Sequence, residues 1–135
     1  METAALQKRV LIYLFDFLLS LGIGLAIAVP FLTVLHLHIA FYYLIGFGFC
    51  IIINFFFKFI ILVSSKGYTI SSVIFGVKYV SGNGGLINRK QCFMRAYTES
   101  IFIFALFDLF YFLANRTERG VIDRLSDSFA IDTRY

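Results

Sequence analysis

Three long stretches of almost uninterrupted apolar residues dominate this chain, at 10–32, 40–63 and 96–114. At a rise of about 1.5 Å per residue, the first two are long enough to cross a hydrocarbon core of about 30 Å. Hydrophobic residues make up 60% of the chain, against about 45–50% in a soluble domain, and a soluble monomer of this size could not bury them. We therefore predict an all-α integral membrane protein, with 1–135 as a single membrane domain in contact with the lipid bilayer.

The first two stretches are joined by a short link, 33–39, so we expect them to form an antiparallel transmembrane hairpin. The link carries no charged side chain, whereas the basic pair Lys8–Arg9 precedes the hairpin and Lys66 follows it. The positive-inside rule therefore places the N-terminus in the cytoplasm. The link also holds His36 and His38, but two histidines at this spacing share no helical face, so we expect no metal site there.

The next segment, 64–95, has the character of a cytoplasmic loop, because it carries five basic side chains and no acidic one. We expect an interfacial helix leading into a short strand over Ile70–Val80. The run Ser81–Gly85 is typical of a turn and lies between Val77–Val80 and Leu86–Ile87, so the loop is expected to hold a small β-hairpin.

The third apolar stretch, 96–114, is interrupted by two acidic residues, Glu99 near its start and Asp108 in its middle. A central Asp costs about 2.5–3.5 kcal/mol for insertion, so this stretch is marginal as a span. A full crossing would place the polar tail, 115–135, outside the cell, whereas the four arginines of the tail favour the inside. The sequence leaves both alternatives open, a spanning and a re-entrant third helix.

Ionisable side chains at membrane depth mark functional sites by default. Asp16 lies seven residues after Arg9, and Lys58 lies six residues before Ser64 on the returning helix, so an ion pair at equal depth is predicted. In one interpretation Asp16 binds a proton or cation and Lys58 takes the place of the ion; in the other Lys58 snorkels and Asp16 is only its structural partner. Asn54, one turn before Lys58, extends this site or bonds a neighbouring helix.

Several other classes of protein are excluded by their missing motifs. The chain has no GxSxG, HExxH or P-loop sequence and no paired carboxylates at catalytic spacing, so we expect no enzyme. The two cysteines are 42 positions apart and form no CxxC or metal spacing. The aromatic residues lie in apolar runs rather than among Lys and Arg, which excludes a nucleic-acid platform. No cofactor or metal is expected.

A series of short motifs runs through nearly the whole chain, from an Arg at the head of the first span to an Arg-Gly-x-x-Asp sequence in the tail. Their residues are Arg9, Asp16, Gly67, Thr69, Gly76, Lys78, Arg95, Asp108, Arg119, Gly120 and Asp123. In order and spacing this series resembles the RDD family of small membrane proteins. The chain departs from the family pattern at Ser71 and Ser72, where Gly-Lys is usual, and at Ile122, where His is usual.

The resemblance implies that Arg9, Asp16 and Asp123 form a triad. If the three lie in one cluster, Asp123 must return to the cytoplasmic side, because a full crossing would place it about 30 Å from Arg9. The third apolar stretch would then be re-entrant. Since some members of the family are sodium/proton antiporters, the resemblance also implies transport of a monovalent cation or a proton.

We therefore expect a transport protein of a bacterial cell membrane that exchanges cations for protons through embedded carboxylates. The candidate ion- or proton-binding residues are Asp16, Asp108 and Asp123, and their partners are Arg9, Lys58 and Asn54. Two or three spans cannot enclose a path alone, so a homo-oligomer or a partner membrane protein is expected. The alternative is a non-transporting subunit or scaffold that binds a protein partner and whose buried charges fix helix packing.

Overall fold

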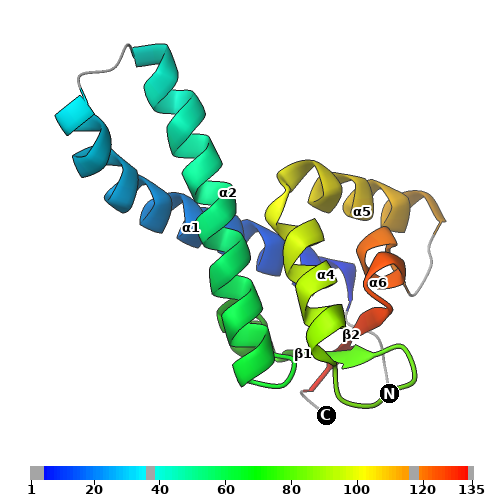
Figure 1. The fold of residues 1–135 in the computed structure, drawn as a ribbon. Helices are drawn as coiled ribbons and strands as arrows, with labels where there is room; N and C mark the ends of the chain where they lie inside the picture. Colours follow the sequence, from blue (N-terminus) through cyan, green and yellow to red (C-terminus); the bar gives the residue numbers. More distant parts are fainter. Residues whose placement is uncertain (1–4, 36–38, 116–118, 134–135) are drawn as a thin grey trace.

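The computed structural model describes residues 5–35, 39–115 and 119–133, so His36 and His38 lie outside the described residues. The chain is mainly helical, with one small sheet (Figure 1). In chain order the elements are α1 (Leu6–Leu35), α2 (Ile39–Ser64), α3 (Ile70–Phe75), β1 (Val77–Ser81), α4 (Arg89–Ser100), α5 (Phe102–Asn115), α6 (Val121–Leu125) and β2 (Ser128–Asp132).

The predicted hairpin is confirmed by α1 and α2, two helices long and apolar enough to cross a membrane over Leu6–Phe31 and Ile39–Ser64. The helices meet closely at Gly24, where a Cβ atom would lie 2.2 Å from Sγ of Cys50. A groove of about 570 Å³ opens between them, lined by apolar side chains such as Leu25. Most large apolar side chains of both helices point outward, as lipid-facing residues do.

The third apolar stretch is not one straight helix. The chain breaks at Ile101, and the axes of Arg89–Ser100 and Ile103–Asn115 differ by 94°. One face of α5 is exposed and apolar, through residues such as Phe107 and Phe110, while Asp108 on the opposite face is buried. Such a helix is suited to lie along or within a bilayer without crossing it.

The polar tail returns to the end of the hairpin where the chain begins. Strand β2 pairs antiparallel with β1, in a register that runs from Val77 opposite Asp132 to Ser81 opposite Ser128. Strand β2 also lies beside the start of α1, because Lys8 of α1 forms an ion pair with Asp132 of β2. The third stretch is thus a bent pair of helices, either a broken span or a re-entrant loop, and the tail after it lies beside the start of α1.

The short helix and strand expected within Ile70–Val80 are present as α3 and β1. The predicted turn is also present, since Ser81 N–H donates to the Gly85 carbonyl at 3.0 Å. Of the predicted hairpin only one bridge forms, between Val80 and Leu86. The main partner of β1 is instead β2, about fifty positions away, and local turn signals do not reveal such a long-range pairing.

A buried apolar cluster joins the start of α1 and the end of α2 to the loop and the tail. It contains Ile12 of α1, Leu62 of α2, Tyr79 of β1, Cys92 of α4 and Ala130 of β2. Five elements that are distant in sequence therefore converge on one region, and the charged side chains described below lie beside it.

Candidate functional site

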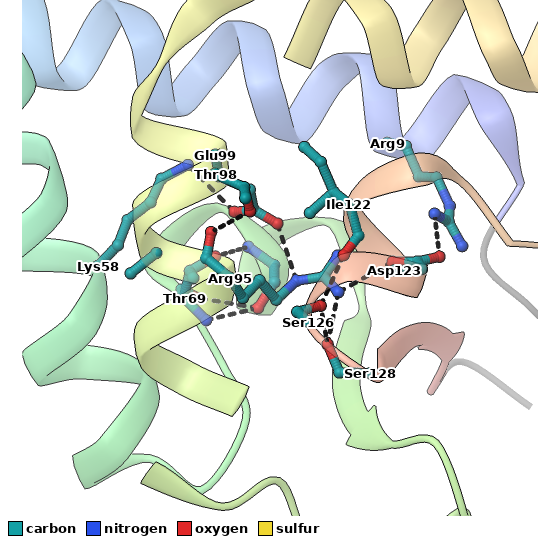
Figure 2. Close-up of polar contacts among 12 residues, drawn as sticks. Arg9, Lys58, Thr69, Arg95, Thr98, Glu99, Ile122, Asp123, Ser126 and Ser128 are labelled. Atoms are coloured by element: carbon teal, nitrogen blue, oxygen red, sulfur yellow. Dashed lines mark hydrogen bonds and ion pairs between the residues drawn. The ribbon is translucent and has the colours of Figure 1, made fainter. Parts of the chain in front are cut away.

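Six buried charged side chains of alternating sign form one continuous chain of ion pairs. In spatial order they are Arg9, Asp123, Arg95, Glu99, Lys58 and Asp16. Each is at most 5% exposed. They come from α1, α2, α4 and α6, so this ion-pair chain holds together elements that no local interaction would join (Figure 2).

One half of the ion-pair chain is centred on Asp123. Its Oδ2 lies 2.6 Å from Nη1 of Arg9, and its Oδ1 lies 2.9 Å from Nη1 of Arg95. The Arg95 guanidinium also donates to Oγ of Ser128 at 2.9 Å and lies 3.8 Å from the centre of the Tyr79 ring. Burial raises the pKa of Tyr79 well above 10.0, and the negative charge of the nearby Glu99 carboxylate adds to that rise. The Arg95 guanidinium therefore contacts Asp123, Ser128 and the Tyr79 ring at once.

The other half is centred on Lys58. Its Nζ lies 2.9 Å from Oδ2 of Asp16 and 3.2 Å from Oε2 of Glu99. The predicted Asp16–Lys58 ion pair is confirmed. Glu99 was noted as an acid in the third apolar stretch, but its pairing was not predicted. Its spacing from Arg95 offered a signal, because the two are four residues apart in α4 and Nε of Arg95 lies 2.8 Å from Oε1 of Glu99.

The second oxygen of Asp16 is held by the first turn of α3. Oγ of Ser71 donates to Oδ1 of Asp16 at 2.5 Å and lies 3.0 Å from Oγ1 of Thr69, the N-cap of α3. Gly67 brings β1 close to this turn, because its φ is +113° and a Cβ there would lie 2.2 Å from the carbonyl oxygen of Tyr79. The Gly-x-Thr motif therefore positions α3 against Asp16.

Asp108 lies apart from the ion-pair chain. Its Oδ2 accepts a hydrogen bond from Oη of Tyr13 at 2.9 Å, and its Oδ1 accepts one from the Ile122 N–H at 2.9 Å, at the start of α6. Gly120 allows this approach, because a Cβ there would lie 2.1 Å from Oδ1 of Asp108. Within the described ranges no basic side chain forms an ion pair with Asp108, which is fully buried.

Arg9, Asp16 and Asp123, the triad that the resemblance implies, are therefore not all in direct contact. Arg9 and Asp123 are in direct contact, whereas Asp16 joins them only through three intervening charged side chains.

Counting Asp108, the buried charged residues described by the structure are three basic and four acidic, so with every group ionised their net charge is −1. A single proton or monovalent cation would make this buried set neutral.

Two small cavities lie on either side of Asn54, and one of them reaches Lys58. One, of about 20 Å³, is lined by Lys58, Glu99, Asn54 and Ser100; the other, of about 30 Å³, is lined by Asn54, Ser100 and Ser20 and borders the groove between α1 and α2. Each can hold a particle the size of one water molecule. Asn54 lines both and is 8% exposed, and within 5–35, 39–115 and 119–133 its side-chain amide has no hydrogen bond. Over those same ranges no three His, Cys, Asp or Glu residues are grouped as a metal site.

The model of the RDD family matches residues 3–127, nearly the whole chain, and the matched range includes every member of the ion-pair chain. No curated protein and no solved structure matches the chain.

Proposed function

This chain belongs to the RDD family, and we propose that it exchanges protons for a monovalent cation across a membrane. The observation that supports this proposal best is the buried net charge of −1, since an unneutralised charge inside an apolar environment favours the uptake of one proton or one cation. The proposed role is transport rather than catalysis.

We assign the exchange to the carboxylates on either side of Lys58. The ammonium group lies between Asp16 and Glu99, where it occupies the position that a cation would take. A cation that binds there displaces Lys58, and protonation of a carboxylate releases the cation. Competition of a proton and a cation for the same oxygen atoms is what exchange requires.

The remaining acidic residues have different surroundings. Asp108 has two hydrogen bonds and no ion pair in the part of the chain that the structure describes, so we propose that it also takes up protons. Asp123 is held between two guanidinium groups, so we propose that it positions α6 rather than carrying an ion.

The membrane arrangement of the proposal follows from charge and from the number of spans. The basic residues beside the inner end of the hairpin favour the cytoplasm for both chain ends, in a bacterial cell membrane. Two spanning helices cannot enclose a transport path, so we propose a homo-oligomer as the active form.

The test is proton movement driven by a cation gradient in proteoliposomes that contain the full chain. We expect Na⁺, Li⁺ or K⁺ to drive proton movement in the unmodified protein, and Asp16→Asn and Asp108→Asn to abolish it. Asp132→Asn is the matched control, because Asp132 pairs with Lys8 in the sheet region, outside the cavities. Transport by folded Asp16→Asn at the unmodified rate would contradict the proposal.

One observation favours a second candidate, a non-transporting subunit or scaffold. Each of the six charges in the ion-pair chain has an opposite partner, as expected if the charges only fix helix packing, and the groove between α1 and α2 offers room for a partner helix. For this candidate, proteoliposomes show no cation-driven proton movement, and Asp16→Asn lowers only thermal stability.

A further inference from the structure

The geometry points to a binding site for one dehydrated monovalent cation beside Asn54, where two small cavities share a wall between α1, α2 and the end of α4. This inference rests on the proposed function and adds residues to it: Ser20, Asn54 and Ser100 supply the oxygen ligands. Asn54 carries the argument, because it is a buried polar side chain that faces both cavities and has no hydrogen-bond partner within the described residues.

Ser20 lines one cavity and Ser100 lines both, and each hydroxyl keeps acceptor capacity. A hydroxyl has a single proton to donate and two lone pairs. Oγ of Ser20 donates its proton to the carbonyl of Asp16 at 2.6 Å, and Oγ of Ser100 donates to the carbonyl of Ala96 at 2.5 Å. Their lone pairs are what remains for a ligand, and the Asn54 amide adds a carbonyl oxygen. The Asn54 NH₂ group and Lys58 are donors in the same walls, but these oxygens and the Glu99 carboxylate outnumber them and favour a cation over an anion.

The end of α4 adds negative potential at the same place. Ser100 is the last residue of α4, and the chain then bends by 94° into α5. The last carbonyls of a helix lack intrahelical partners and carry a partial negative charge. Interrupted membrane helices use such ends to coordinate cations. Glu99, one residue earlier, lines the first cavity and contributes to the net charge of the buried set.

The size of the cavities selects a dehydrated ion. Volumes of about 20 and 30 Å³ each admit one particle of the size of water, so an ion with its hydration shell does not fit. The cavities share Phe17, Asn54 and Ser100 in their walls, and the first also touches Lys58. A cation held at Asn54 therefore lies in or next to the cavity that Lys58 and Glu99 line.

The inference is tested by thermal unfolding of the purified full chain in chloride salts of Na⁺, Li⁺, K⁺ and choline at equal ionic strength. A cation that binds the folded state raises the unfolding temperature, whereas choline is too large to enter. We expect at least one small cation to raise the unfolding temperature above the value in choline. Removing one ligand oxygen by Ser100→Ala should weaken the binding of that cation about tenfold.

Asn54→Leu should abolish the cation-specific increase, since it replaces the amide by an apolar group of similar size. Thr98→Val is the matched control: Oγ1 of Thr98 donates to the carbonyl of Met94 within the same helix, as Ser100 does to Ala96, but Thr98 lines neither cavity. Ser100→Ala keeps the test decisive if Asn54→Leu does not fold, because it removes one oxygen with little change of volume.

The inference is overturned if all four salts give the same unfolding temperature, which would mean that the cavities hold only water. It is also overturned if folded Asn54→Leu or Ser100→Ala responds to the cation as the unmodified protein does. A cation-specific increase without antiport in proteoliposomes would support the cation site and contradict the proposed exchange. Antiport with an unchanged KM for the cation in Ser100→Ala would support exchange and contradict this site.

Discussion

Arg9 and Asp123 are separated by 114 positions in sequence, and yet Nη1 of Arg9 lies 2.6 Å from Oδ2 of Asp123. Both side chains are almost fully buried. This single contact joins the first helix to the polar tail, and it holds only if the third apolar stretch returns to the side on which the chain begins. The ion pair between Arg9 and Asp123 therefore depends on the path that the chain takes through its third apolar stretch.

The contact predicts that both ends of the chain are accessible from the same side of the membrane. Ala5 and Thr133 are exposed, so Ala5→Cys and Thr133→Cys should be labelled alike by a membrane-impermeant thiol reagent, in intact cells and in everted vesicles. The two native cysteines are buried and serve as the background. Labelling of the two engineered positions from opposite sides would contradict the fold.

Asp123→Asn should strongly destabilise the protein, because it leaves Arg9 and Arg95 with no full charge to face at this position. Breaking a buried ion pair on one side costs about 3–5 kcal/mol. The measurement is denaturant unfolding in detergent, with Arg9→Met and the double variant completing a cycle. We expect Arg9→Met to cost less in the Asp123→Asn background than alone; equal costs would show that the two residues are not coupled.

Gly120→Ala should cost about 1–3 kcal/mol of stability, as overpacking typically does. The added Cβ would lie 2.1 Å from Oδ1 of Asp108 and would push this carboxylate away from the start of α6. The matched control is Gly22→Ala in α1, where a Cβ meets nothing within 4 Å and where replacing a helical glycine gains about 0.5–1 kcal/mol. Equal effects of the two substitutions in thermal unfolding would argue against the Asp108–α6 contact.

We expect ionisation of Tyr79 to lower the stability of the folded protein at alkaline pH. Burial raises its pKa in the folded protein above 10.0, so above that pH the unfolded state loses the phenolic proton first. The unfolded state then binds fewer protons, and the free energy of unfolding falls as the pH rises from 10.0 through the pKa of the folded state. Below pH 10.0 this contribution is fully present.

Tyr79→Phe removes the titrating group and keeps the ring beneath the Arg95 guanidinium. Between about pH 9 and about pH 11 its unfolding free energy should therefore fall less steeply than that of the unmodified protein. Identical slopes in denaturant titrations at these pH values would show that the phenol is not buried in the folded protein.

Part of the site follows from helix geometry alone. A fixed rise per residue places Asp16 and Lys58 at equal depth in an antiparallel hairpin, and the structure pairs them. The same reasoning could not reach Glu99, because its position depends on where α4 packs against α2 and on the break at Ile101. It could not pair β2 with β1 either, since that contact is long-range.

What the sequence by itself determined is the solvent of this protein, its helical hairpin and its family resemblance. Apolar length and charge depth are properties of single segments, and lipid acts on each segment separately. The tertiary structure decided which charges meet, that the tail returns to Arg9, and that Ser20, Asn54 and Ser100 surround one pair of cavities. Those features depend on packing between segments far apart in the chain, which no local pattern of residues encodes.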